Sequence, residues 1–195
     1  MPLISIHDIC SDVRLGLWKM SEDLTDSIPY YQDAAQLFRS VERQKEYVCV
    51  RLLLEKIIGR EVEITHNENG KPMLKGGGHV SISHTKGYCA VMVSWEHPVA
   101  VDIEYISDRV GRIAHRFLRA DEQVETSVGL LIHWSAKETL YKLFSEDRLL
   151  CEEMRIIPFE ECGRGVIGAE NLKRKQPVEI NYIVTDAYVL TYASA

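Results

Sequence analysis

Several features that define other classes of protein are missing from this sequence. The chain has five cysteines, an odd number, and no two of them form a CxxC pair. We therefore expect neither a disulfide framework nor a structural zinc site. No run of apolar residues approaches the length that a membrane-spanning helix needs. The first residues, MPLISIHDICSDV, lack the basic region and the long apolar run of a signal peptide. We therefore expect a cytoplasmic protein without a membrane partner.

Positive charge is also in short supply. The chain carries 23 Lys and Arg residues against 29 Asp and Glu residues, which gives a formal net charge of −6. This balance provides no global attraction to nucleic acid, so we expect no nucleic-acid partner, and an acidic ligand must be held by a local basic patch. The length of 195 residues, 46% of them hydrophobic, suits one large domain or two small, tightly joined ones.

Hydrophobic periodicity predicts both helices and strands in the first half of the chain. Alternation predicts a strand over residues 3–9, followed by an irregular polar stretch to about residue 32. From Asp33, apolar residues recur at helical spacing as far as Gly59, which predicts a long helix with a glycine stop. A turn is predicted over residues 66–72, and strands at residues 61–65, 79–83 and 88–95.

The second half of the chain shows the same mixture. Helical patterns cover residues 109–117 and 130–144, and strands are predicted at residues 99–105, 154–159, 178–184 and 187–193, the last two as a hairpin. The segment Trp-Glu-His-Pro at residues 95–98 marks a candidate boundary. We therefore predict an α+β fold in which two similar halves, residues 1–96 and 97–195, pack as a pseudo-twofold pair.

Two acidic residues share one face of the strand over residues 99–105. Because side chains alternate along a strand, Asp102 and Glu104 lie opposite the valines, the isoleucine and the tyrosine. Adjacent carboxylates repel, so either one is protonated or a cation neutralises them. Oxygen ligands suit a hard cation such as Mg²⁺. Taken alone, the strand is better explained by a half-exposed strand whose acids face solvent, since such strands are common.

The helix over residues 130–144 presents a second group of candidate residues. Trp134, Glu138 and Lys142 are four residues apart and lie along one face, with Lys137 beside Glu138. A surface helix with a Glu–Lys pair is the plainer interpretation. However, a tryptophan on that face requires burial or a ligand beside it.

Two shorter motifs precede these elements. Ser83-His84-Thr85 ends an apolar strand, where all three side chains can donate hydrogen bonds to phosphate oxygens. Gly70-Lys71-Pro72 forms a rigid turn that presents one lysine. Taken alone, a hairpin turn with a satisfied histidine explains the first motif, and the second says nothing about function.

Taken in order, the four segments resemble the 4′-phosphopantetheinyl transferase superfamily in its larger two-half form, the surfactin-synthetase-activator type. That family has a Gly-Lys-Pro turn, a strand that ends Ser-His-Ser/Thr, an Asp-x-Glu strand and a Trp-x-x-Lys-Glu-x-x-x-Lys helix. The segment RFLRADE at residues 116–122 is also similar to the family pattern. The resemblance covers about residues 43–144. Ala100 and Thr85 depart from the commoner glycine and serine without removing a charged group.

The resemblance implies an enzyme of the holo-[acyl-carrier-protein] synthase type. It would transfer the 4′-phosphopantetheine arm of coenzyme A to a serine of an apo acyl- or peptidyl-carrier protein and release 3′,5′-ADP, with Mg²⁺ as cofactor. Because both halves are in one chain, the cleft between them needs no partner subunit, and we expect a monomer.

The resemblance also implies roles for individual residues. The first half would contribute to coenzyme A binding, and the second would carry the metal and catalytic residues. The implied metal ligands are Asp102, Glu104 and Glu138, and the implied catalytic residues are these three and Lys142. The general base is either Glu138, directly or through water, or a water that Glu104 activates. The implied coenzyme A contacts are Arg51, Lys71, Pro72, Ser83, His84, Lys137 and Lys142.

Other interpretations remain open. A non-catalytic coenzyme A-binding regulator is the main alternative, followed by a metal-dependent nuclease or phosphatase and by an interaction module. For the carrier partner, the densest basic stretch runs from Arg109 to Arg119. We expect Ile113 and Phe117 to form an apolar contact rimmed by Arg112 and Arg119, unless the two apolar residues belong to the core.

Overall fold

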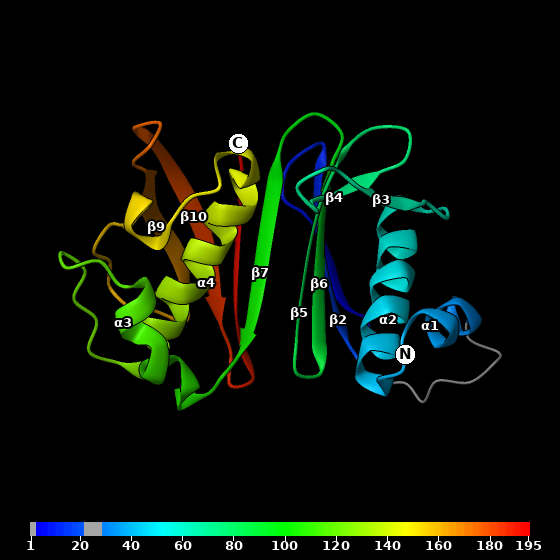
Figure 1. Ribbon diagram of the computed structural model, residues 1–195, viewed down its shortest axis with the longest axis horizontal. Helices are drawn as coiled ribbons and strands as arrows, with labels where there is room; N and C mark the ends of the chain where they lie inside the picture. The colour runs from blue at the N-terminus through cyan, green and yellow to red at the C-terminus, as the bar shows by residue number, and fades with distance from the viewer. Residues whose placement is uncertain (1–2, 22–28) are drawn as a thin grey trace.

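The computed structural model describes residues 3–21 and 29–195, which fold into two halves side by side (Figure 1). Each half combines an antiparallel sheet with one long helix. Within the described residues, the first sheet has the strand order β1-β2-β6-β5-β4-β3. Its strands are β1 (Leu3–Asp8), β2 (Val13–Lys19), β3 (Ile64–His66), β4 (Pro72–Leu74), β5 (His79–Thr85) and β6 (Tyr88–Ser94).

The second sheet has the order β7-β11-β10-β9-β8. Its strands are β7 (Val99–Tyr105), β8 (Met154–Ile156), β9 (Arg164–Asn171), β10 (Gln176–Val184) and β11 (Tyr188–Ser194). The four residues 95–98 connect β6 to β7, so the chain passes from one half to the other there. The α+β fold in two halves that the sequence predicts is therefore confirmed.

Helix α2 (Val41–Ile58) covers the first sheet, with the short helix α1 (Tyr31–Leu37) beside it (Figure 1). Ser40 caps the start of α2 by accepting a hydrogen bond from the Arg43 amide, and Gly59 ends the helix with φ of 83°. On β2, Gly16 lets the helix approach closely, since a Cβ there would lie 2.7 Å from side-chain atoms of Leu53 and Ile57. The first core cluster lies between α2 and this sheet.

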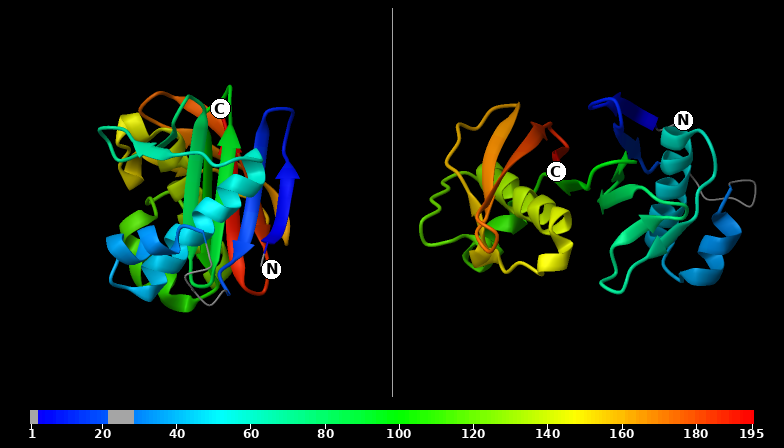
Figure 2. Two further views of the ribbon diagram at one scale, coloured as in Figure 1. Left: turned by 90° about the vertical axis from the view of Figure 1, so that its right-hand side faces the viewer. Right: turned by 90° about the horizontal axis from the view of Figure 1, so that it is seen from above.

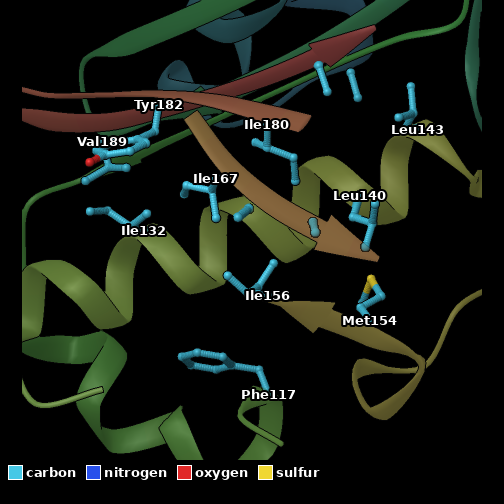
Figure 3. Close-up of a cluster of buried hydrophobic side chains, with 14 of the residues drawn as sticks. Phe117, Ile132, Leu140, Leu143, Met154, Ile156, Ile167, Ile180, Tyr182 and Val189 are labelled. Carbon is cyan, nitrogen blue, oxygen red and sulfur yellow. The ribbon is translucent and has the colours of Figure 1, made fainter. Parts of the chain in front are cut away.

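Helix α4 (Ser127–Leu143) packs on β7 and β11 of the second sheet. Its buried residues meet side chains of β8, β9, β10 and β11, as Figure 3 shows for Ile132, Leu140, Ile156, Ile167 and Ile180. Three short 3₁₀ helices, η1 (Asp108–Ile113), η2 (Ser145–Asp147) and η3 (Cys151–Glu153), and helix α3 (Ala114–Phe117) complete this half. No helix within residues 3–21 and 29–195 combines the length and apolarity needed to cross a membrane.

Strands β5 and β7 lie side by side where the two halves meet, as Figures 1 and 2 show. They are joined by side-chain hydroxyls that accept hydrogen bonds from backbone amides of β7. Ser81 accepts from the Val101 amide at 3.0 Å, Ser83 from Ile103 at 3.2 Å and Thr85 from Tyr105 at 3.1 Å. We call these three hydroxyls the hydroxyl ladder. The ladder satisfies amides on the edge of the second sheet that would otherwise lack partners.

Several element predictions need correction. Strand β2 lies where the sequence suggests an irregular stretch, because β1 and β6 pair with it on both sides. The helix predicted from Asp33 is broken after Leu37, since Ser40 caps a new one. Strand β9 is absent from the sequence-based prediction, and two of its glycines leave room for neighbouring side chains, since a Cβ at Gly165 would lie 2.8 Å from Tyr182 and one at Gly168 would lie 3.2 Å from Ile157. The helix expected over residues 109–117 is largely 3₁₀.

Candidate active site

The acidic face of β7 meets the polar face of α4. Asp102 and Glu104 both point toward this helix, as their bonds show: Trp134 Nε1 donates to Glu104 Oε1 at 2.8 Å, and Lys142 Nζ donates to Asp102 Oδ1 at 2.7 Å. Glu138 lies one helical turn from each of these two α4 residues. The strand and the helix thus bring together the residues that the two sequence patterns selected. We call Asp102, Glu104 and Glu138 the carboxylate cluster.

Asp102 is almost fully buried, with 3% of its surface exposed, and accepts three hydrogen bonds from two different elements. Ser83 of β5 and Lys142 of α4 donate to Oδ1, at 2.9 and 2.7 Å, and Ser135 of α4 donates to Oδ2 at 2.8 Å. Lys142 also donates to the Val101 carbonyl at 3.0 Å. Residues of both halves therefore fix the orientation of this carboxylate.

Sequence reasoning did not select Ser135, which belongs to a buried group of hydroxyls. Its Oγ lies 2.9 Å from Thr191 Oγ1 on β11, which in turn lies 2.6 Å from Thr139 Oγ1 on α4. Ser135 and Thr139 are four residues apart and face β11 together. This four-residue spacing of polar side chains on the buried face of the helix is a pattern that could have been found in the sequence.

Negative charge dominates the cluster. Burial raises the pKa of Glu104, and the charge of Asp102 raises it further, while the Trp134 hydrogen bond opposes the shift. Burial also raises the pKa of Glu138, again with a contribution from Asp102. Among the described residues, no side chain or amide donates a hydrogen bond to the Glu138 carboxylate. Lys142 is thus the cation set against three acids.

The chemistry of these donors suits a hard divalent cation. A carboxylate has about four acceptor positions, and Asp102 uses three of them, so one remains for a ligand. Glu104 uses one oxygen for Trp134 and keeps the other. Glu138 keeps both. An all-oxygen, negatively charged set with neighbouring space for phosphate is the kind that Mg²⁺ binds.

The carboxylate cluster is more open than a closed metal cage. Its ligand atoms do not all lie within 4.8 Å of one another. Within residues 3–21 and 29–195, a different group of three possible ligands meets that criterion: Asp12, Glu96 and His97. There, Asp12 accepts hydrogen bonds from the Ser94 hydroxyl and the Glu96 amide, and so stabilises the connection between β6 and β7. We assign this second group a structural role because Asp12 is engaged in the turn and Glu96 and His97 are solvent-exposed.

A cavity of about 500 Å³ adjoins Lys142 in the cleft between the halves. The first half contributes Lys71, Pro72 and residues of β5, and the second contributes the C-terminal end of α4 and the segment after it. We call this space the cleft cavity. Lys71 is half-buried, and burial lowers the pKa of its ammonium group. The cavity lining is Glu68, Asn69, Gly70, Lys71, Pro72, Val80, Ser81, Ile82, Tyr141, Lys142, Ser145 and Arg148.

Comparison with protein families identifies both halves. Residues 98–193 match the model described as the 4′-phosphopantetheinyl transferase superfamily. Residues 34–94 match the model described as the 4′-phosphopantetheinyl transferase N-terminal domain. The chain belongs to the 4′-phosphopantetheinyl transferase superfamily. No curated protein matches the chain. The presence of the N-terminal domain agrees with the larger, two-half type of phosphopantetheinyl transferase.

The structure corrects the expectation for Lys137 in this transferase. Its side chain is 1% exposed and points into the second half, away from the cleft cavity. The Lys137 ammonium donates to Glu122 Oε2 and the Phe117 carbonyl, both at 2.7 Å, and to the Cys151 carbonyl at 3.3 Å. Lys137 therefore anchors neighbouring segments to α4 and does not reach a phosphate in the cleft.

Three other predicted coenzyme A contacts have protein partners. The Ser83 hydroxyl is occupied by Asp102 and by the Ile103 amide, so it orients a carboxylate instead of facing a ligand. His84 is exposed and its Nδ1 lies 3.3 Å from Glu46 of α2. The Arg51 guanidinium lies over the Tyr47 ring at 3.2 Å. Neither His84 nor Arg51 lines the cleft cavity, whereas Lys71, Pro72 and Lys142 do.

The basic stretch from Arg109 to Arg119 also differs from the expectation. Phe117 is 1% exposed and packs against the Trp134 ring, with 5.3 Å between centroids, so it belongs to the core. Arg119 donates to Asp121 at 2.9 Å and to the Glu152 carbonyl. Arg112 is exposed and forms no ion pair with the described residues. Of the two rim arginines, Arg112 is thus the one that is free for a partner.

Proposed function

We propose that this transferase moves the 4′-phosphopantetheine arm of coenzyme A onto a serine of an apo acyl- or peptidyl-carrier protein. The observation that carries the proposal is the position of Lys142, which contacts the carboxylate cluster and also lines the cleft cavity. A cation site and a space for an anionic nucleotide are therefore contiguous. Coenzyme A, with its pyrophosphate and its 3′-phosphate, matches both.

In the proposed reaction, the serine oxygen of the carrier attacks the β-phosphorus of coenzyme A. The new P–O bond forms as the bond between that phosphorus and the bridging oxygen breaks, and 3′,5′-ADP leaves with the electron pair. Negative charge accumulates on the phosphoryl oxygens, so electrostatic stabilisation and positioning provide most of the catalysis. Lys142 is placed to contact these oxygens from the cleft cavity.

Mg²⁺ held by Asp102, Glu104 and Glu138 would supply further positive charge for the phosphoryl oxygens. The protein prepares these ligands through their neighbours. Ser83 and Ser135 hold the Asp102 carboxylate in one orientation, and the Trp134 indole holds Glu104. Fixed ligands avoid reorganisation during the reaction.

Glu138 is the candidate general base for the serine proton. Its carboxylate accepts no hydrogen bond from the described residues, and its raised pKa brings its basicity closer to the working pH of a cytoplasmic enzyme. A water molecule activated by Glu104 is the alternative base, since burial and Asp102 raise the pKa of Glu104 as well.

The test is transfer itself. Purified protein is incubated with coenzyme A, Mg²⁺ and an apo carrier protein, and intact-mass spectrometry of the carrier is expected to show the gain of one phosphopantetheine. Glu104→Gln serves as the matched control, with little or no gain expected. Tight coenzyme A binding without any mass gain on a panel of apo carriers would favour the non-catalytic regulator instead.

We further propose that the enzyme is a cytoplasmic monomer. The cleft cavity draws its lining from both halves of one chain, so a second copy is not required to complete it. Light scattering during size exclusion should give the mass of one chain. Loss of transfer on dilution, together with dissociation of a dimer, would contradict this proposal.

A further inference from the structure

Two cations of the cleft cavity form no ion pair among the described residues, although the charge of Glu146 acts on one of them, Lys71. Lys71 comes from the first half and Arg148 from the second, and neither forms an ion pair there. Arg148 donates instead to a neutral group, with 2.7 Å between its Nη2 and Asn69 Oδ1. By contrast, Lys142, which also lines the cavity, is paired with Asp102.

The acid next to Arg148 is already occupied. Asp147 accepts hydrogen bonds from the side-chain Nδ2 of Asn171 at 2.8 Å and from the Arg174 guanidinium at 2.6 Å. Arg148 itself adopts a left-handed backbone conformation, with φ of 49°, which is uncommon for an arginine. The strained backbone and the fixed neighbour direct the arginine toward the first half, where Asn69 receives it.

The opposite side of the cavity is also built rigidly. The Asn67 carboxamide oxygen accepts hydrogen bonds from the amides of Asn69, at 3.0 Å, and Lys71, at 2.9 Å. The Gly70 amide bonds to the Asn67 carbonyl, and Gly70 has a φ of 78°. This turn fixes both Asn69 and Lys71, so the contact between Asn69 and Arg148 joins two ordered segments across the cleft.

We infer that Arg148 is an additional coenzyme A-binding residue, which contacts a phosphate at the nucleotide end together with Lys71. This inference rests on the proposed function and goes beyond the residues that the family motifs indicate. The apolar part of the lining, which includes Pro72, Ile82 and Tyr141, is of the kind that accepts a purine ring. Two cations that form no ion pair with the described residues are available for the phosphates beside it.

The bond to Asn69 gives Arg148 a second effect. It holds the guanidinium at the cavity before the ligand arrives, so less side-chain freedom is lost on binding. It also connects the two halves, in addition to the hydroxyl ladder. Asn69→Ala should therefore weaken coenzyme A binding less than the loss of the Arg148 charge does.

The experiment measures equilibrium binding of coenzyme A and of 3′,5′-ADP by calorimetry at low and high salt. Arg148→Gln should weaken both ligands by about tenfold or more at low salt, as expected for the loss of a charge-assisted hydrogen bond. The difference from wild type should shrink at high salt, and Arg148→Lys should fall between the two. Arg164→Gln, at an exposed arginine of β9 outside the cavity, is the matched control and should bind as wild type does.

The outcomes separate this inference from the proposed function. Unchanged affinity of Arg148→Gln, in a wild type that binds coenzyme A and transfers its arm, would overturn the role of Arg148 and leave the function standing. A wild type that binds neither ligand would refute the proposed function itself. Because Arg148 is exposed, circular dichroism should show that Arg148→Gln folds normally.

Discussion

Two lysines on α4, five positions apart, form ion pairs of the same length and serve different purposes. Lys137 and Glu122 are 2.7 Å apart with side chains 1% and 2% exposed, while Lys142 and Asp102 are 2.7 Å apart with side chains 26% and 5% exposed. The first pair lies inside the second half. The second pair lies at the cleft cavity, where a ligand can reach the lysine.

The difference between them lies in the remaining contacts. Lys137 fills its donors with Glu122 and two backbone carbonyls, and the Glu122 carboxylate also accepts from the amides of Arg119 and Ile156. This pair therefore connects α4 to the segment before it and to β8. Lys142 instead joins an acidic cluster that has more negative than positive charge. An interior pair with all its bonds satisfied stabilises the fold, whereas a pair at a cavity can exchange partners with substrate.

The largest expected effect comes from breaking the interior pair. Lys137→Met leaves the Glu122 carboxylate buried without its cation, and this should lower the free energy of unfolding by about 3–5 kcal/mol. Urea denaturation monitored by circular dichroism measures the change. Lys142→Met is the matched control on the same helix and should lose less than half as much. If the two variants lost equal free energy of unfolding, the two lysines would not differ in their contribution to the stability of the fold.

The second effect concerns activity. Lys142→Ala should lower kcat/KM for transfer by about 10²-fold, because it removes a cation from the developing phosphoryl charge. Lys142→Arg should recover part of the rate, since the guanidinium keeps the charge but differs in shape and reach. Steady-state kinetics at limiting coenzyme A measures both variants. Wild-type kinetics for Lys142→Ala would remove Lys142 from the catalytic residues.

The third prediction concerns how the stability of the folded protein depends on pH. It tests whether repulsion within the carboxylate cluster destabilises the fold. Burial and Asp102 raise the pKa of Glu138 above its ordinary value of 4.5, so the unfolded chain loses this proton before the folded chain does. The stabilisation that the neutral Glu138 carboxyl contributes is fully present below pH 4.5. It is lost as pH rises through the pKa that Glu138 has in the folded state. In EDTA at neutral pH, Glu138→Gln should therefore have a higher Tm than wild type.

Adding Mg²⁺ provides the control for this pH effect. The ion should raise the Tm of wild type at neutral pH, because it binds the folded cluster and offsets its repulsion. It should raise the Tm of Glu138→Gln less. A metal-free Glu138→Gln with lower Tm than wild type across the whole pH range would indicate that Glu138 stabilises the fold.

The smallest effect extends the comparison to two arginines. Arg112 is exposed and unpaired among the described residues, whereas Arg119 is held by Asp121 and by the Glu152 carbonyl. Arg112→Glu should raise KM for an acidic carrier about threefold at low salt and less at high salt, because rim charges act on the association rate. KM for coenzyme A should not change. An unchanged KM for the carrier at low salt would place the docking surface elsewhere.

Local patterns grouped the members of the carboxylate cluster within each element, and the family resemblance alone implied that the two elements meet. Alternation in β7 placed Asp102 beside Glu104, and four-residue spacing placed Glu138 beside Trp134 and Lys142, because both periodicities depend on local geometry alone. Lys137 could not be placed in this way. Its partner Glu122 is 15 residues away in an irregular segment, and helical spacing does not reveal which residue lies opposite in the core.

The same limit applies to the fold. The long strands and helices with clear periodicity were predicted, whereas β2 and β9 were not. Strand β2 has a nearly continuous buried run because neighbouring strands and α2 cover it, so alternation is absent. Strand β9 contains glycines that weaken its pattern and that make close contacts with side chains from other segments. Both strands depend on tertiary contacts that a local pattern does not contain.

The hydroxyl ladder determines how β7, at the edge of the second sheet, aligns with β5 of the first. Its bonds join residues that are always 20 positions apart, so the strands run in parallel register. Hydroxyls at every second position would allow a slide by two residues that still keeps most of these bonds. Such a slide would bring Ser81 or Thr85 to the place of Ser83 beside Asp102, but it would leave the β7 amide at one end of the ladder, that of Val101 or of Tyr105, without its hydroxyl. The match between three hydroxyls and three amides therefore favours the native alignment of the halves over its nearest competitor.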